Sequence, residues 1–298
     1  MMQIMNRQNL AYVYAVLSVL LWGTVASAFK LTLRYLDVIS MLFFASLSSL
    51  VLLFGILIVQ GKLLLLTRYS RQDYLHSLLF GALNPFFYYI VLFKAYSLLP
   101  AQEAQPLNQM WALILPLFSV IFLKQRIPLK SVFALIVSFL GVLVIVTHGN
   151  PFSLSFSCPI GTLLAVGSAF IWALFWISNL RDTREEVSKL FLNFLFGVFY
   201  IAVVQLIQGG FQVPPMWGVV GAVYIGFFEM GITFIFWMKA LQLSETTAKI
   251  TNIIYLIPFL SLMIITVMLG EAILWSTIIG LVLIIGGNML QQCGRGRL

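Results

Sequence analysis

The sequence has few charged residues and few of the side chains that build catalytic or metal centres. Of its 298 residues only 9% are charged, two are histidine and two are cysteine. Soluble domains carry about a quarter charged residues, and no water-soluble fold of this length could bury a chain that is 61% hydrophobic. His76 and His148 form no metal-ligand pattern. We therefore predict no metal site, no cofactor and no water-soluble fold.

Acidic residues are also scarce, and nothing marks a nucleic-acid partner. Nine acidic and 17 basic residues give a formal net charge of +8. The basic residues lie in short loops between apolar runs and form no basic face or nucleic-acid motif, so we interpret them as a signal for membrane orientation. Cys158 and Cys293 are expected on opposite sides of the membrane, which excludes a disulfide within the chain.

Long apolar runs occupy most of the sequence. A helix needs about 20 mostly apolar residues to cross a bilayer, and barrel strands would alternate in polarity, which these runs do not. Backbone groups in lipid must be paired within the segment, so the runs are expected to be helices. The sequence predicts an all-α polytopic membrane protein with ten transmembrane helices. Their approximate limits are 10–29, 37–60, 74–96, 102–123, 129–147, 159–179, 187–208, 215–240, 247–269 and 273–292.

Lysine and arginine gather in alternate loops. If the N-terminus is cytoplasmic, the cytoplasmic loops and ends hold twelve basic residues, and the outer loops hold only Lys30 and Arg34, with Lys94 near the outer end of the third span. Basic residues favour the cytoplasmic side. We therefore predict a multi-pass protein of a bacterial inner (plasma) membrane, with both termini in the cytoplasm.

The two halves of the chain share a register. A shift of 145 residues places Lys94-Ala95 on Lys239-Ala240 and Gly141 on Gly286. Because five spans are an odd number, two such halves must insert in opposite directions, a plan that is frequent among secondary transporters. The sequence thus predicts two inverted five-helix repeats, residues 1–150 (helices 1–5) and 151–298 (helices 6–10). The alternative is a chance likeness between apolar helices.

Four segments carry motifs of a known family. They are WGTVASAFKLTL at 22–33, PLFSVIFLKQRIPLKSVFALIVSFLGVLVIV at 116–146, SAFIWALFW at 168–176 and PFLSLMIITVMLGEAILWSTIIGLVLIIGG at 258–287, which contains Gly270-Glu271. In this order and spacing they resemble the EamA-like carriers of the drug/metabolite transporter superfamily, and 168–176 is most similar to the aromatic amino-acid exporter branch. The resemblance implies ten helices, a central cavity and the export of metabolites.

Two positions depart from this pattern. Phe43-Phe44-Ala45-Ser46 stands where many members of the family have an arginine early in helix two. In the first half, Gln125-Arg126 stands where the family usually has a Gly-Glu pair. The departures leave the expected fold unchanged, but they leave the substrate and the coupling ion open.

Glu229 is an acidic residue near the middle of the eighth span, and no basic residue is close to it in sequence. A charge inside a span costs roughly 2.5–3.5 kcal/mol on insertion scales, so such residues are usually functional. We predict that Glu229 binds the ammonium group of a substrate or carries a proton for coupling. The alternative is a structural carboxylate, hydrogen-bonded to a neighbouring helix.

Other polar and aromatic residues inside the spans complete the predicted substrate-binding set. Some begin spans four and nine, others lie deep in spans, and Asn84-Pro85 predicts a kink in span three because proline frees a backbone carbonyl. Interhelical hydrogen bonds or simple packing are the alternative roles. The predicted set is Trp22, Asn84, Tyr88, Gln105, Asn108, Trp111, Trp172, Trp176, Glu229, Thr233, Asn252 and Tyr255.

These features together predict a carrier rather than an enzyme. The expected cargo is a small metabolite, an amino acid or a related amphiphile, exported by alternating access around a central cavity. Drugs and purine-like compounds are the alternative cargo. A passive channel would need a continuous polar stripe and a membrane-embedded enzyme a convergent catalytic set, and the sequence contains neither. The expected partners are the small-molecule substrate and membrane lipid, and the sequence does not distinguish a monomer from a homodimer.

Overall fold

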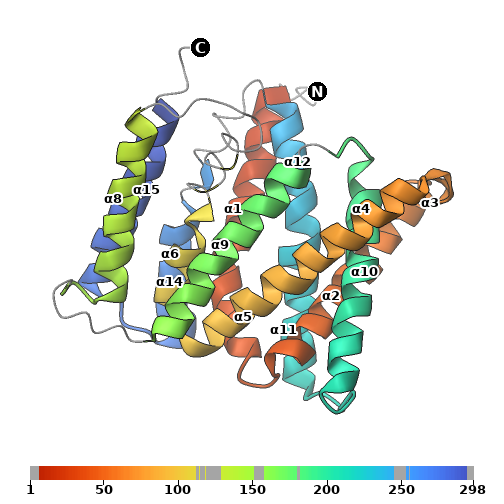
Figure 1. Cartoon of the computed structure of the whole chain (residues 1–298), viewed down its shortest axis with the longest axis horizontal. Helices are drawn as coiled ribbons and strands as arrows, with labels where there is room; N and C mark the ends of the chain where they lie inside the picture. The colour runs from red at the N-terminus through yellow and green to blue at the C-terminus, as the bar shows by residue number, and fades with distance from the viewer. Residues whose placement is uncertain are drawn as a thin grey trace, which may run out of the picture. The chain divides into compact units, whose positions relative to one another are not determined.

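The computed structural model describes residues 7–111, 114, 118, 129–150, 158–179, 182–244, 253–254 and 256–293. Within these residues all regular secondary structure is helical (Figure 1). The chain forms two units, and each combines segments from both halves of the sequence. Unit 1 comprises Met1–Ile90 and Thr183–Ile257, and unit 2 comprises Val91–Asp182 and Pro258–Leu298. The repeats predicted at 1–150 and 151–298 follow a different division of the chain and stay a prediction.

Unit 1 is built from long helices of the first and second halves. Helix α2 packs against α10 and η2, and α1 packs against α12. The π-helical segment η1 continues α4, and the chain passes into unit 2 within α5 (Tyr88–Leu98). The elements are α1 (Arg7–Thr32), α2 (Val38–Val59), α3 (Leu63–Arg68), α4 (Arg71–Gly81), η1 (Ala82–Phe87), α10 (Glu186–Ile207), α11 (Met216–Tyr224), η2 (Ile225–Ile232) and α12 (Thr233–Leu243).

Polar side chains cap the starts of three of these helices. The carboxylate of Asp37 accepts hydrogen bonds from the backbone N–H groups of residues 39 and 40 at the start of α2. Ser70 and Asp73 form a reciprocal capping box at the start of α4, and Glu185 caps α10. Such caps satisfy N–H groups that have no partner inside the helix, so they fix where each helix begins.

Unit 2 is built around a close helix pair. Helices α8 and α15 approach so closely that a Cβ added at Gly141 would lie 2.5 Å from the carbonyl oxygen of Gly280. Small residues commonly permit such contacts between membrane helices. Helix α6 packs against α9, α8 and α15. The helices of the unit are α6 (Ala101–Asn108), α8 (Leu129–Val146), α9 (Pro159–Asn179), α14 (Ile257–Leu269) and α15 (Trp275–Cys293).

Six helical segments of the described residues are long and apolar enough to cross a membrane. They are Arg7–Thr32, Val38–Val59, Arg71–Leu98, Pro159–Asn179, Glu186–Ile207 and Met216–Ala240. The corresponding six predicted spans are therefore confirmed as candidates. Shorter apolar helices lie at Ile136–Ile145, Ile257–Leu269 and Trp275–Gly287. The predicted spans 102–123 and 247–269 include residues outside the described part, so the count of ten stays a prediction.

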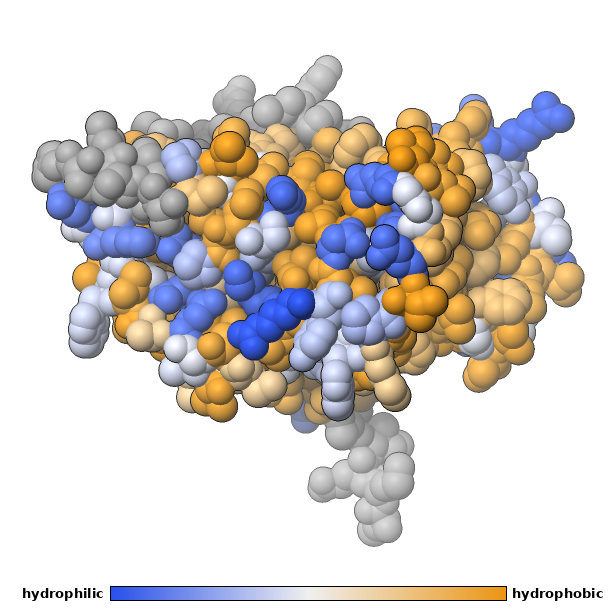
Figure 2. Space-filling model, turned by 90° about the horizontal axis from the view of Figure 1, so that it is seen from below, coloured by the Kyte–Doolittle hydropathy of each residue, from blue (hydrophilic) through white to orange (hydrophobic). Residues whose placement is uncertain are grey.

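Many large apolar side chains are exposed, as a lipid environment requires. Val59, Val213 and Val267 have exposed fractions of 88%, 97% and 82%. Figure 2 shows apolar residues, in orange, over much of the face that it draws. A water-exposed protein rarely leaves so much contiguous apolar surface uncovered.

Two of the spanning segments have irregular centres. In η1, Asn84 has a non-helical backbone (φ −148°, ψ 120°), and Pro85 cannot donate the hydrogen bond that an α-helix would give to the carbonyl of Gly81. The kink predicted in span three is therefore confirmed. The second irregular segment, η2, contains Glu229, which lies 145 positions after Asn84, the same shift that aligns the two halves. Irregular turns inside helices are frequent at functional sites.

Candidate functional site

Glu229 is the most deeply buried acidic residue among the described residues of unit 1. It lies in η2 and has an exposed fraction of 6%. The hydroxyl of Tyr89, near the start of α5, donates to its Oε1 over 3.1 Å, and the indole of Trp22 from α1 lies beside the carboxylate. The other oxygen, Oε2, has no partner among the described residues. Three elements thus converge on one carboxylate and leave one of its oxygens open.

Two further aromatic rings pack against Trp22. The ring centroids of Trp22 and Trp237 are 5.8 Å apart, and those of Trp22 and Phe234 are 6.5 Å apart. Trp237 and Phe234, both on α12, are almost completely buried. We call Glu229, Tyr89, Trp22, Trp237 and Phe234 the Glu229 site.

The Glu229 site is suited to a positive charge. The Tyr89 hydroxyl and the Trp22 indole beside the carboxylate are both neutral, and no described lysine, arginine or histidine pairs with it. An ionised carboxylate without a counter-charge is expensive in an apolar environment. An ammonium group could donate to Oε2 and lie against the indole faces, which attract cations. Alternatively the carboxyl could hold a proton.

Three more predicted residues lie in unit 1. Tyr88 packs edge-on against Tyr89, with ring centroids 4.7 Å apart. The hydroxyl of Thr233 donates to the carbonyl of Phe228, one turn earlier in the same span. This hydroxyl therefore has no further proton to donate to a ligand. Asn84 is completely buried, and neither its amide oxygen nor its amide nitrogen has a partner in the described part of the chain.

The predicted polar residues of span four lie in unit 2. The hydroxyl of Tyr96 donates to Oε1 of Gln105 over 2.5 Å. The amide of Asn108 donates to Oγ of Ser168 on α9 over 2.8 Å. Gln105 and Asn108 therefore both form hydrogen bonds within unit 2. Hydrogen bonding of this kind is the role that the sequence left open as the alternative to substrate binding.

The predicted tryptophans of unit 2 gather along α9. Trp172 and Trp176 are buried, with ring centroids 6.0 Å apart in an edge-to-face arrangement. Trp111 packs against a small apolar cluster that includes Ala169 and Ala173 of the same helix. Five of the predicted residues thus lie in each unit, and their assignment to one binding site stays a prediction. Asn252 and Tyr255 lie outside the described residues.

Sequence reasoning missed part of the Glu229 site. Tyr89 was not among the predicted binding residues, although it follows Tyr88 directly and makes the hydrogen bond to Glu229. Trp237 and Phe234 follow Glu229 by eight and five positions, so they are about two turns and one and a half turns further along the helix. Their position near a buried acid was the signal that could have identified them.

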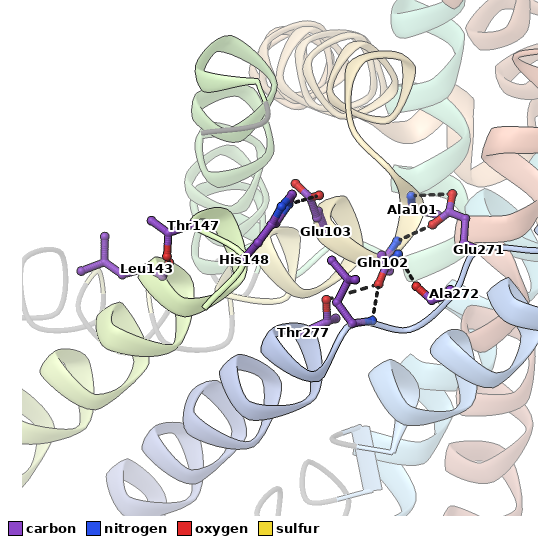
Figure 3. Close-up of polar contacts among 10 residues, drawn as sticks. Ala101, Gln102, Glu103, Leu143, Thr147, His148, Glu271, Ala272 and Thr277 are labelled. Atoms are coloured by element: carbon purple, nitrogen blue, oxygen red, sulfur yellow. Dashed lines mark hydrogen bonds and ion pairs between the residues drawn. The ribbon is translucent and has the colours of Figure 1, made fainter. Parts of the chain in front are cut away.

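A second polar cluster ties together three elements of unit 2 (Figure 3). The carboxylate of Glu271 accepts from the backbone N–H groups of Ala101 and Gln102 over 3.1 and 3.2 Å. In return, Oε1 of Gln102 accepts from the backbone N–H of Leu274 over 3.1 Å, next to the start of α15. The segment before α15 thus caps the start of α6, and a side chain of α6 in turn accepts from the backbone next to the start of α15.

A polar contact between a histidine and a buried carboxylate lies beside these caps. Nε2 of His148, just after α8, is 3.0 Å from Oε1 of the buried Glu103 on α6. Figure 3 shows both side chains pointing toward each other. Among the described residues no group of three or more histidine, cysteine or acidic side chains could hold a metal ion. His148 therefore contacts the carboxylate of Glu103, and the described residues include no cluster of side chains that could bind a metal ion there.

Comparisons with known proteins agree with this architecture. The family model described as "EamA-like transporter family" matches residues 9–147 and again 159–291. An "Uncharacterized transporter" of Clostridium kluyveri is 26% identical over 184 residues, and the match spans 58% of each protein's length. A structure titled only "Crystal structure of protein" has 21% identity, a TM-score of 0.69, and coverage of 96% of this chain and 98% of that one. The chain therefore belongs to the EamA-like transporter family and is a multi-pass membrane protein.

Proposed function

We propose that the protein carries a small amphiphilic metabolite, most simply an amino acid, out of a bacterial cell across the inner membrane. The observation that carries this proposal is the buried Glu229 carboxylate, which has one open oxygen and accepts from the neutral hydroxyl of Tyr89 on the other. A purely structural carboxylate would be expected to satisfy both oxygens within the protein. An open oxygen among aromatic rings fits a ligand with an ammonium group and an apolar body.

The expected mechanism is alternating access between two inverted repeats, 1–150 and 151–298, with both termini cytoplasmic. Family membership supports a carrier. The irregular segments η1 and η2, which occupy the same register of the two halves, support a binding region in the middle of the membrane, because carriers often bind substrates at interrupted helices. The cargo is a small molecule, and lipid surrounds the helices.

Transport by purified protein in liposomes tests the proposal. Wild-type protein is expected to exchange a labelled aromatic amino acid in a saturable manner and with counterflow. Glu229→Gln should lower the affinity about 10- to 100-fold, because a hydrogen bond to a charged group contributes about 1.5–3 kcal/mol. Glu186→Gln, a carboxylate change outside the Glu229 site, is the matched control and should transport normally. Non-saturable flux would indicate a channel and contradict the proposal.

The same variant separates the two roles of Glu229. If the carboxylate binds the ammonium group, E229Q loses exchange as well as gradient-driven transport. If Glu229 carries the coupling proton, E229Q keeps exchange and loses only the dependence on a pH gradient. Wild-type transport that ignores the gradient would exclude the proton role. If drugs or purine-like compounds inhibit transport and amino acids do not, the cargo belongs to this alternative class.

A further inference from the structure

A second group of unpartnered polar side chains lies where η1 crosses α10. Asn84 of η1 and Asn193 of α10 have exposed fractions of 0% and 1%. The amide nitrogen and the amide oxygen of both residues lack a hydrogen-bond partner among the described residues. Nearly all buried polar groups in proteins are paired, so this cluster requires an explanation.

The two asparagines belong to one tight contact. A Cβ added at Gly81 would lie 2.5 Å from the backbone oxygen of Asn193, and one added at Gly197 would lie 2.5 Å from Cδ of Pro85. Asn84 immediately precedes Pro85, and Asn193 is one helical turn before Gly197. The break in η1 therefore brings a buried amide from each element to the same crossing.

The chemistry of this crossing limits what it can bind. The open groups offer both donors and acceptors, and neither side chain carries a charge. No described salt bridge involves η1 or the middle of α10, so an ion would lack a counter-charge and its desolvation would be costly. The complementary ligand is an uncharged group that both donates and accepts, as a carboxamide does.

We propose that Asn84 and Asn193 form a second subsite, which binds an uncharged hydrogen-bonding group of the cargo, of the carboxamide type. The inference rests on the proposed function, because it assigns a second polar group to the molecule whose ammonium binds at Glu229. Asn84 and Glu229 hold equivalent positions in the two halves. The irregular segment η1 thus offers a neutral amide and η2 an acidic carboxylate. Together they select cargo that carries an uncharged hydrogen-bonding group and an ammonium group.

Stability measurements test the subsite without any ligand. Asn84→Leu and Asn193→Leu keep the approximate shape and remove the unpaired polar atoms, so the melting temperature is expected to rise. Gln205→Met is the matched control, because the amide of Gln205 is also buried but donates to Ser40 and to the carbonyl of Gly210. That control should melt at a lower temperature. A lower melting temperature in both leucine variants would assign the asparagines a structural role and overturn the proposal.

Binding measurements test the specificity. The probes are phenethylamine, which has the ammonium and the ring, and matched amines that add a primary carboxamide, namely phenylalaninamide and its longer homologues. Wild-type protein is expected to bind at least one carboxamide about tenfold more tightly than phenethylamine, which corresponds to about one net hydrogen bond. In the N84L/N193L double variant no carboxamide should bind more tightly than phenethylamine.

The outcomes separate the two proposals. E229Q should weaken every probe by a similar factor and keep the preference for the carboxamide. Equal binding of phenethylamine by E229Q and the wild type would contradict the Glu229 site but not the asparagine subsite. Conversely, no preference in the wild type, or an unchanged preference in N84L/N193L, would overturn the asparagine subsite and leave the Glu229 site standing.

Discussion

Glu271 connects the segment before α15 to the start of α6, which is far away in sequence. Its carboxylate accepts from the backbone N–H groups of Ala101 and Gln102, about 170 residues earlier in the chain. The negative charge also lies at the N-terminus of α6, where the helix dipole favours it. The family's Gly-Glu pair, identified from the sequence alone, therefore acts as a cap in the second half of this chain.

Removal of this cap should destabilise unit 2. Glu271→Ala leaves two N–H groups at the start of α6 without their acceptor, and we expect a loss of about 1–2 kcal/mol, typical of a helix cap. Glu271→Gln keeps one neutral acceptor and should lose less. Unfolding in mixed micelles with increasing denaturing detergent measures both. Equal stability of the alanine variant and the wild type would show that the cap contributes nothing.

The loop before α10 should respond to acid. Burial raises the pKa of Glu185, but hydrogen bonds from Lys62 and Ser188 outweigh burial and hold the pKa below its usual value of 4.5. Nζ of Lys62 is 2.8 Å from its Oε1. Because the folded state binds this proton less readily than the unfolded chain, the stabilising contribution is present above pH 4.5 and is lost as the pH falls through the lower folded-state pKa.

Glu185→Gln tests this response. Between about pH 6 and pH 3 the wild type should lose more stability than E185Q, by less than about 1 kcal/mol because the pair is partly exposed. Detergent unfolding at several pH values gives the difference. Parallel pH curves for the two proteins would contradict the prediction, and Lys62→Met should reproduce the effect of E185Q near neutral pH.

Single residues were predictable where their chemistry was unusual for their position. Glu229 and Trp22 could be selected because an acid in a span is rare and a tryptophan there is conspicuous, and the structure places them in contact. Tyr89 and Asn193 were not selected. Tyrosine and asparagine are common enough in membrane helices that only the packing of α5 and α10 reveals what they face.

At the scale of helices, the α8–α15 contact makes a sharp prediction. Gly141 and Gly280 approach each other so that a Cβ on either would lie 2.5 Å from the other's carbonyl oxygen. G141A or G280A should force the helices apart and cost about 1–3 kcal/mol, as overpacking does. Gly286 lies on the same helix α15 with nothing within 4 Å of an added Cβ.

Gly286→Ala is therefore a matched control. It should be neutral or stabilise the protein by up to about 1 kcal/mol, because alanine favours helix more than glycine does. Stability of all three variants can be compared in the same detergent titration. A destabilisation of G286A equal to that of G280A would show that the effect arises from α15 itself and not from its contact with α8.

Apolar length predicted the positions of helices well but not their irregularities. The break in η1 could be expected from Asn84-Pro85, since proline cannot donate to the preceding turn. Nothing in the sequence of η2 marks it in the same way, because that segment contains no proline. There, Gly226 and Gly231 press against α2 at Ala45 and Leu52, so the irregular turn depends on tertiary contacts.

At the scale of the whole molecule, the distribution of basic residues predicts a topology that labelling can test. After replacement of both native cysteines by serine, Asn150→Cys should react with a membrane-impermeant maleimide added to whole cells. Thr183→Cys, on the other side of α9, should react only after the membrane is opened. Reaction of both positions from the outside would refute the predicted orientation and the inverted repeat with it.

The sequence repeat did not predict the two units. The register of 145 residues pairs one half of the chain with the other, but the units join Met1–Ile90 to Thr183–Ile257 and Val91–Asp182 to Pro258–Leu298. Apolar periodicity identifies which face of a helix is buried and says little about its partner, because most apolar helices can pack together in lipid. The pairing of α2 with α10, for example, required the structure.

This exchange of segments between the halves has a consequence for biosynthesis. Tyr89 and Glu229, joined by a hydrogen bond, are 140 residues apart. At about 5–20 residues per second, the ribosome adds the second residue roughly 7 to 28 s after the first. During that interval the early helices of unit 1 are in the bilayer without their later partners, so insertion must precede assembly. A nascent chain interrupted between its halves would leave both units incomplete.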